Sequence, residues 1–243
     1  MLDHITIRVA DVDASHEFYD ALLAELGQEP APDDDDYIEW GKFGVAQANR
    51  ERGVTRGHHI GLRAQSREQV DAFHERGLSL GATSDGEPGP RPQYGENYYG
   101  AFLRDLDGGS IEAVHDSGTG TTGIVDHMTL GAGDFGAQKA FAQALLPLIG
   151  WNERADEPAR FRIGDSQTSA ISWLGDGRAP TTGLHIGFGL ATTELVDEFH
   201  RALVAAGYAD DGAPGLRPEY SEGYYGAFVT DPDGNSFEAM TRV

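Results

Sequence analysis

The stretch RPQYGENYYGAFLRDLDGGSIEA (Arg91–Ala113) recurs 126 positions later as RPEYSEGYYGAFVTDPDGNSFEA (Arg217–Ala239), and 15 of its 23 positions are identical. Shorter segments recur at nearly the same spacing: Asp3-His4 with Asp126-His127, His59-Ile60-Gly61 with His185-Ile186-Gly187, and Phe73-His74 with Phe199-His200. Because the matches cover both ends and the middle, the chain is expected to be a tandem duplication of one domain.

The boundary between the copies is expected in DSGTGTTG (Asp116–Gly123), a small, polar and glycine-rich stretch typical of a linker. We therefore predict two domains, residues 1–117 and residues 124–243. The 243 residues fit two domains near the usual size.

The amino-acid composition limits the classes of molecule that the protein is expected to bind. The 40 acidic and 18 basic residues leave a net charge of −22, which disfavours nucleic acid, and no apolar run is long enough to span a bilayer. With no visible secretory signal, the expectation is a cytoplasmic protein that acts on a small molecule, without a membrane partner. There are no cysteines, so any metal must be held by His, Asp, Glu or neutral oxygen.

Hydrophobic periodicity divides each copy into two units of strand, helix and three strands, with Asp33–Asp36 and Ser84–Pro90 read as loops. The predicted helices are Asp13–Gly27, Arg67–Gly81, Gly136–Leu148 and Glu194–Gly207. The predicted strands are Leu2–Val9, Tyr37–Trp40, Gly44–Ala48, His59–Ala64, Tyr98–Arg104, Ser110–His115, Val125–Leu130, Leu184–Leu190, Tyr224–Thr230 and Ser236–Thr241.

Alternation along the strands places polar groups opposite the helices. In Leu2–Val9 the apolar residues share one face, so His4 lies on the other. The same argument puts His59 and Glu112 on a cleft face. In the second copy it selects the matching residues His127, His185 and Glu238.

Two neutral imidazoles and one carboxylate suit Fe, Mn, Zn, Ni or Co as a divalent ion and leave coordination positions open for substrate. A lone histidine on a strand is more often structural, and duplication also copies residues that have no role in metal binding. The recurrence of a whole His/His/Glu set nevertheless favours a divalent metal at one or both sites.

The paired units, the first-strand Asp-His, Phe18-Tyr19 and the pattern YYGAF…D-x-D-G…E-A together resemble the glyoxalase/bleomycin resistance/dioxygenase (vicinal oxygen chelate) superfamily over essentially the whole chain. The resemblance implies an α+β fold of four βαβββ modules that form two glyoxalase-like domains with incompletely closed eight-stranded barrels. It also implies metal ligands at His4, His59, Glu112, His127, His185 and Glu238.

Some members of this superfamily exchange halves between subunits, and a fused chain could do the same internally. His4 would then join His185 and Glu238, while His127 would join His59 and Glu112. Sequence leaves this exchanged arrangement and the unexchanged one open, together with a monomer that acts as a fused pseudo-dimer or a homodimer.

Two departures limit the function. Glyoxalase I enzymes supply a fourth ligand from the fourth strand, but GVAQA (Gly44–Ala48) and TSAISW (Thr168–Trp173) have no carboxylate, and Gln47 is a weak substitute. Extradiol dioxygenases and fosfomycin-modifying members of the superfamily often have a tyrosine ten residues before the carboxylate ligand. At those positions this chain has Phe102 and Phe228. These two residues, with Tyr98 and Tyr224, are the candidate substrate-binding residues.

The favoured hypothesis is a metal-dependent enzyme of dioxygenase, lyase or isomerase type that acts on a small oxygenated substrate, with strict glyoxalase I disfavoured. The alternative is a metal-free, bleomycin-resistance-like protein that sequesters a cationic ligand, which the acidic composition favours. Specificity is expected to reside in loops at Asp85–Pro92 and Asp211–Pro218.

Overall fold

The computed structural model describes residues 1–31, 37–116, 123–165 and 170–243. The predicted turn Asp33–Asp36, most of the predicted linker and the start of Thr168–Trp173 lie outside the described residues. The elements follow one another as four modules: β1 (Leu2–Val9), α1 (Val12–Ala24), β2 (Tyr37–Trp40), β3 (Phe43–Gln47); β4 (His58–Arg63), α2 (Arg67–Ser79), β5 (Thr83–Pro90), β6 (Tyr99–Arg104), β7 (Ser110–His115); β8 (Val125–Gly131), α3 (Phe135–Ile149), β9 (Asn152–Glu157), β10 (Arg160–Gly164), β11 (Ala170–Leu174); β12 (His185–Gly189), α4 (Thr193–Ala205), β13 (Ala209–Leu216), β14 (Tyr224–Thr230), β15 (Ser236–Arg242).

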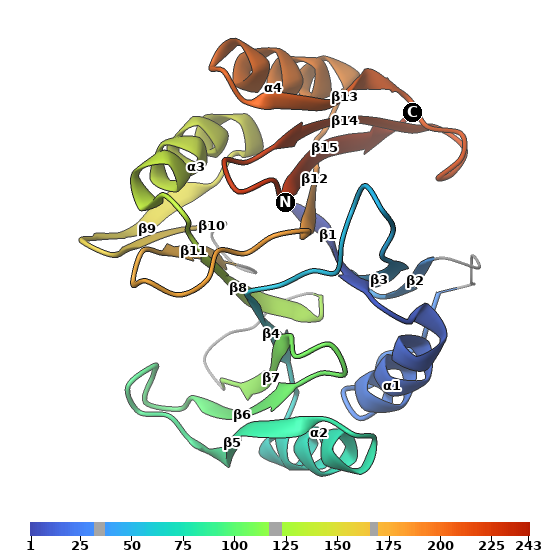
Figure 1. The fold of residues 1–243 in the computed structure, drawn as a ribbon, viewed down its shortest axis with the longest axis vertical. Coiled ribbons are helices and arrows are strands. Elements are labelled where there is room, and N and C mark those ends of the chain that lie inside the picture. Colours follow the sequence, from blue (N-terminus) through green and yellow to red (C-terminus); the bar gives the residue numbers. More distant parts are fainter. Residues whose placement is uncertain (32–36, 117–122, 166–169) are drawn as a thin grey trace.

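The strands form two mixed, open sheets, and each sheet combines modules from both repeats (Figure 1). The first has the order β13-β14-β15-β12-β1-β3-β2, so it joins the first module to the fourth. The second has the order β5-β6-β7-β4-β8-β11-β10-β9 and joins the second module to the third. The junctions are antiparallel pairs, β1 with β12 and β4 with β8. The structure therefore has the exchanged arrangement, with eight strands in one sheet and seven described strands in the other.

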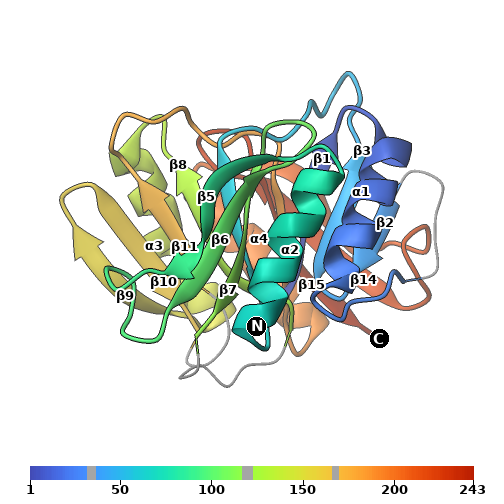
Figure 2. The ribbon, with the colours of Figure 1, turned by 90° about the horizontal axis from the view of Figure 1, so that it is seen from below.

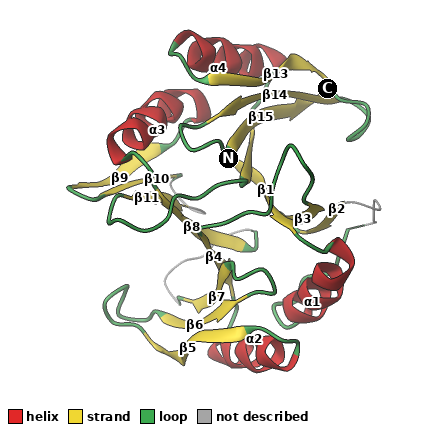
Figure 3. Ribbon diagram, viewed as in Figure 1, coloured by secondary structure: helices red, strands yellow, loops and turns green. Residues whose placement is uncertain are grey.

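The helices cover the sheets in pairs. α1 packs against α2 and α3 against α4, while α2 and α4 each lie along the last three strands of their own module. Figures 2 and 3 show these helices on the outside of the strand layers. The apolar alternation explains the packing, because Ile5, Ile7 and Val9 of β1 are buried in the hydrophobic core. The opposite face of each sheet is left free to line a cavity.

Every helix begins at a side chain that accepts a hydrogen bond from a backbone N–H of the first turn, which satisfies a donor that the helix leaves unpaired. The capping residues are Asp11, Ser66, Asp134 and Thr192. In the part of the chain that the structure describes, the longest helix is α3, with 15 residues. Among the described residues no helix has the length and apolar character needed to cross a membrane.

The prediction of a loop at Ser84–Pro90 is wrong, because these residues belong to β5, which pairs with β6. The predicted specificity loop at Asp211–Pro218 is likewise mostly β13. Both strands are polar, glycine- and proline-rich edge strands with shifted registers, so they lack the apolar alternation on which the prediction relied. The exposed strand β9 was missed for the same reason.

A buried hydrogen bond ties α1 to the turn between β6 and β7. The Tyr19 hydroxyl donates to Asp105 Oδ2 at 2.6 Å, and Tyr19 is 1% exposed. We expect Tyr19→Phe to lower the free energy of unfolding by about 1–3 kcal/mol, because it removes a buried donor from a carboxylate. Urea unfolding would measure this loss. Tyr99→Phe removes an exposed hydrogen bond to Asp71 and is expected to cost under about 0.5 kcal/mol; equal losses in the two variants would contradict the prediction.

Candidate metal centres

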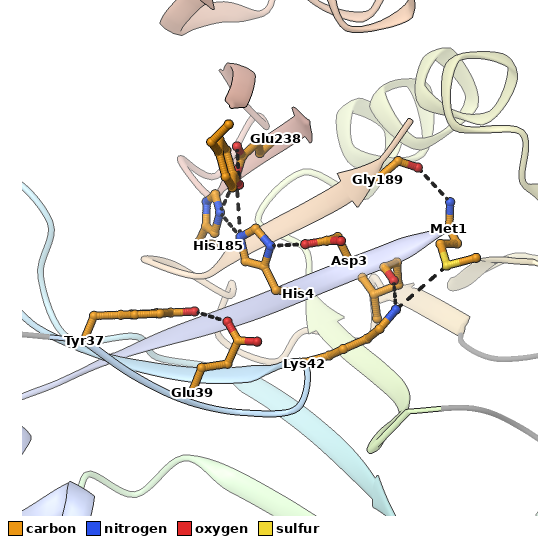
Figure 4. Close-up of polar contacts among 11 residues, drawn as sticks. Met1, Asp3, His4, Tyr37, Glu39, Lys42, His185, Gly189 and Glu238 are labelled. Carbon is orange, nitrogen blue, oxygen red and sulfur yellow. Dashed lines mark hydrogen bonds and ion pairs between the residues drawn. The ribbon is translucent and has the colours of Figure 1, made fainter. Parts of the chain in front are cut away.

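Three side chains from three neighbouring strands of the first sheet converge at one point (Figure 4). His4 lies on β1, His185 on β12 and Glu238 on β15. His4 Nε2 is 3.0 Å from His185 Nε2, His185 Nε2 is 3.1 Å from Glu238 Oε2, and His4 Nε2 is 3.4 Å from the same oxygen. These three atoms form a nearly equilateral triangle inside the protein.

The second sheet contains a matching cluster of His59 on β4, Glu112 on β7 and His127 on β8. His59 Nε2 is 3.1 Å from Glu112 Oε2 and 3.2 Å from His127 Nε2, and His127 Nε2 is 3.4 Å from Glu112 Oε2. The six residues singled out from the sequence are therefore brought together in two groups, each with two side chains from one repeat and one from the other. His4 with His59 and Glu112, the unexchanged combination, does not form a cluster.

The two triangles have the size that a divalent ion requires. Zinc and similar ions lie about 2.0–2.2 Å from imidazole nitrogen and carboxylate oxygen. Ligand atoms at that radius are about 3.0 Å apart at right angles and about 3.4 Å apart at the tetrahedral angle. The observed separations of 3.0–3.4 Å span these values. The donor set and its spacing therefore fit a metal ion.

A glycine opposite each first-strand histidine makes room for its ring. His4 pairs across the sheet with Gly187, and His127 pairs with Gly61. A Cβ on either glycine would lie 2.3 Å from Cε1 of the facing imidazole. The duplicated His-Ile-Gly segment thus supplies one candidate ligand directly and leaves room for another across the strand, a role for Gly61 and Gly187 that was not predicted from the sequence.

Carboxylates orient the first-strand histidines. The Nδ1–H of His4 donates to Asp3 Oδ1 at 3.0 Å, and that of His127 donates to Asp126 Oδ1 at 2.9 Å. Because a carboxylate only accepts, Nδ1 carries a proton, and Nε2 is the ring nitrogen that is turned into the cluster. Such outer contacts fix the tautomer and ring orientation of metal-binding histidines. The repeated Asp-His pair carried this signal in the sequence.

The other carboxylate oxygen of each cluster is held by a phenol. Tyr98 donates to Glu112 Oε1 and Tyr224 donates to Glu238 Oε1, both at 2.8 Å. Both glutamates are only 1% exposed, so this bond leaves Oε2 as the atom that faces the histidines. The hydroxyls of Tyr98 and Tyr224 are therefore committed to positioning the carboxylates.

The electrostatics of each cluster favour a positive charge. Burial opposes the charged form of His4, but hydrogen bonds to Asp3 and Glu238 outweigh it and raise the pKa of His4 to about 9. The pKa of His185 is lowered, chiefly by burial. In the other cluster the pKa of His127 is likewise raised to about 9. The carboxylates of each cluster therefore favour a protonated first-strand imidazole, and a divalent ion would have to displace that proton from Nε2.

Each cluster opens into a cavity, of about 800 Å³ beside His59 and about 700 Å³ beside His185. Phe102 stacks on His59 with ring centroids 5.9 Å apart, and Phe228 lies 6.1 Å from His185. Both phenylalanines line their cavities, so each centre has an apolar wall next to one imidazole.

The fourth strands bring no carboxylate to either centre. The residues of β3 and β11 that line the cavities are Ala46, Ser172 and Leu174. Gln47 points elsewhere: its amide bonds backbone groups between Val9 and Val12 and at Ala48.

The neighbouring strands contain cavity residues that were not predicted from the sequence. Tyr37 and Glu39 of β2 line the cavity beside His4, and the Tyr37 hydroxyl donates to Glu39 Oε2 at 2.7 Å. Arg160 and Arg162 of β10 line the other cavity. The alternation of these side chains with buried apolar residues is the only sequence signal that could have revealed them.

Comparison with known proteins identifies the family. The model of the Glyoxalase/Bleomycin resistance protein/Dioxygenase superfamily matches residues 1–113. A glyoxalase/bleomycin resistance protein from Albidiferax ferrireducens is 36% identical over 48% of this chain and 99% of its own, with a TM-score of 0.43. No curated protein matches the chain by sequence.

Two larger structures share the fold over 99% of this chain. Glyoxalase I from Zea mays has a TM-score of 0.69 at 18% identity, with 92% of its chain covered. A putative dioxygenase from Bacillus subtilis has a TM-score of 0.64 at 15% identity, with 84% covered. The paired modules and their open sheets agree with this likeness. The chain belongs to the glyoxalase/bleomycin resistance protein/dioxygenase superfamily.

Proposed function

We propose that each cluster binds one divalent metal ion and that the protein is an enzyme acting on a small oxygenated substrate. The observation that carries this proposal is the spacing of the ligand atoms, 3.0–3.4 Å in both clusters. The proposed ligands are His4, His185 and Glu238 at one centre, and His59, Glu112 and His127 at the other.

The donor set selects the kind of ion. Two imidazoles and one carboxylate suit Fe, Mn, Zn, Ni or Co and leave positions open for water and substrate. When bound, such an ion would act as a Lewis acid that holds substrate oxygens and stabilises charge developing on them. The cavities of 700–800 Å³ have the volume of small-molecule sites.

The chain itself supplies orientation and an apolar surface. Tyr98 and Tyr224 keep each carboxylate turned toward its histidines. Phe102 and Phe228 offer flat apolar surfaces beside His59 and His185, and we propose that they contact the substrate. Tyr98 and Tyr224 line the same cavities, and we propose that their rings contact the substrate while their hydroxyls hold the carboxylates.

The reaction class is proposed to be dioxygenase, lyase or isomerase chemistry rather than that of a strict glyoxalase I. The fourth-strand positions that line the cavities, Ala46 and Ser172, offer no carboxylate that could serve as a ligand or general base. Glu39 does bring a carboxylate to one cavity, but it lies on β2, outside the three-ligand cluster, and accepts a hydrogen bond from Tyr37.

Metal stoichiometry tests the proposal. Protein loaded with Mn(II) and freed of unbound ion is expected to hold about two equivalents by elemental analysis. His59→Ala and His185→Ala are each expected to hold about one, because loss of one of three ligands disables one centre. His16→Ala, a histidine outside both clusters, is the control and is expected to keep two.

The alternative, a metal-free protein that sequesters a cationic ligand, makes the opposite prediction. Under it, the wild-type chain would hold under about a tenth of an equivalent, and neither His59→Ala nor His185→Ala would change that value. Stabilisation by a cationic glycopeptide in a thermal-shift assay, with none by Mn(II), would then favour sequestration.

A further inference from the structure

The two centres differ in charge at one structurally equivalent position. Two residues after the first-strand histidine, Thr6 pairs with Gly44, which pairs with Glu39. In the other sheet Thr129 pairs with Ser172, which pairs with Arg162. Glu39 and Arg162 therefore occupy the same place in their sheets, with opposite charge.

Both side chains face their cavities. On β10 the flanking residues Phe161 and Ile163 are fully buried in the core, and Arg162 alternates with them onto the cavity side. On β2 Ile38 and Trp40 are buried, and Glu39 faces the cavity beside His4. The difference in charge is therefore presented to whatever enters each cavity.

Within residues 1–31, 37–116, 123–165 and 170–243, the guanidinium of Arg162 has no hydrogen-bond or ion-pair partner, and its Nε is buried without an acceptor. Asp126 and Tyr98, which support His127 and Glu112, line the same cavity, and the negative charge of Asp126 favours the charged form of Arg162. Burial lowers the pKa of Arg162, and Arg160 adds to this effect, so the guanidinium is poorly solvated and would gain from an anion.

The other arginines of this cavity are already paired. Arg104 contacts Asp85 at 2.6 Å, Arg178 contacts Asp176 at 2.7 Å, and Arg160 lies 3.9 Å from Glu157. In the second cavity Arg52 Nη2 donates to both carboxylate oxygens of Asp211, and Arg8 and Arg217 donate to backbone carbonyls. Among the arginines that line the two cavities, Arg162 is the one whose Nε is buried without an acceptor among the described residues, whereas Arg242 of the second cavity is exposed and lies over the ring of Tyr224.

We propose that the cavity beside His59, Glu112 and His127 takes a small oxygenated molecule that carries a carboxylate, bound by Arg162, and that Glu39 disfavours such a molecule in the other cavity. A planar guanidinium binds a carboxylate through two parallel hydrogen bonds. The proposal rests on the ion-binding role assigned to both clusters. It gives the duplicated centres different ligands.

The experiment compares 3,4-dihydroxybenzoate with its methyl ester, which has the same pair of vicinal oxygens and a similar ring but no charge. Each is titrated without oxygen into Mn(II)-loaded His185→Ala protein, in which only the centre at His59 remains. The acid is expected to bind at least about tenfold more tightly than the ester. Arg162→Gln in the same background is expected to remove this preference while leaving affinity for the ester within about twofold.

The reciprocal arm uses Mn(II)-loaded His59→Ala protein, in which only the centre at His185 remains. There the ester is expected to bind more tightly than the acid, and Glu39→Gln is expected to raise affinity for the acid by at least about fivefold. Elemental analysis must show the same manganese content with and without Arg162→Gln or Glu39→Gln, so that a change in affinity reports the ligand and not the ion.

Equal affinity for acid and ester at the centre containing His59, equal losses of both in Arg162→Gln, or binding of neither would overturn the charge assignment. In those cases the manganese content would still support the proposed function. If the wild-type chain retains no manganese, the proposed function fails and this inference fails with it.

Discussion

The double variant His4→Ala/His185→Ala is expected to retain about one equivalent of Mn(II), whereas His4→Ala/His59→Ala is expected to retain none. In the exchanged arrangement His4 and His185 belong to one centre, 3.0 Å apart, so the first variant spares the other centre. His4 and His59 belong to different centres, so the second variant disables both. Elemental analysis after removal of unbound ion would measure the difference.

The unexchanged arrangement predicts the reverse stoichiometry, because it would place His4 with His59 in one centre and His185 in the other. A value of none for His4→Ala/His185→Ala, with one for His4→Ala/His59→Ala, would therefore contradict the sheet order described above. Thermal unfolding of both variants controls for loss of fold, since each removes two imidazoles from equivalent positions.

Much of the fold could be predicted because apolar alternation is strong wherever a strand meets a helix. Strands such as Ser110–His115 and Tyr224–Thr230 have the predicted bounds. Alternation also gave the face of each candidate ligand, and His4 and Glu238 do line a cavity opposite the helices. The face of the sheet on which a side chain lies follows from the alternation of its immediate neighbours, and a local sequence pattern contains this information.

The pairing of the modules could not be predicted, because it depends on contacts between distant strands. β1 and β8 carry the same Asp-His pattern, and β4 and β12 the same His-Ile-Gly pattern. Either partner would satisfy the alternation, so local sequence does not distinguish exchanged from unexchanged sheets. The exchanged arrangement is seen in the strand registers of the structure, in which His4 lies opposite Gly187 and His127 lies opposite Gly61.

The charge difference between Glu39 and Arg162 could not be predicted from the sequence for another reason. The repeat is strongest in the strands that end each copy, whereas β2 and β10 have no visible similarity in sequence. Glu39 and Arg162 become equivalent only through the ladder that links each of them to the first-strand histidine. The candidate ligands are thus the same in the two copies, whereas this pair of cavity-lining residues differs in charge.

Gly61→Ala is expected to weaken Mn(II) binding at the centre containing His59 by roughly 10–100-fold or more, as measured by competition with a chelator in the His185→Ala background. The added Cβ would lie 2.3 Å from Cε1 and 2.5 Å from Nδ1 of His127, so the ring must move. Its Nδ1 is held at 2.9 Å by Asp126, so the displacement falls on Nε2, the proposed ligand atom.

The matched variant Gly187→Ala tests the same contact at the other centre, where the Cβ would lie 2.3 Å from Cε1 of His4. It is expected to weaken only that centre, measured in the His59→Ala background, while Gly53→Ala, which meets open space, should leave both unchanged. If Gly61→Ala binds Mn(II) with unaltered affinity and has a normal unfolding temperature, metal binding does not depend on the position of the His127 ring opposite Gly61. Because metal ligands must be held within about 0.5 Å, such tolerance would argue against His127 as a ligand.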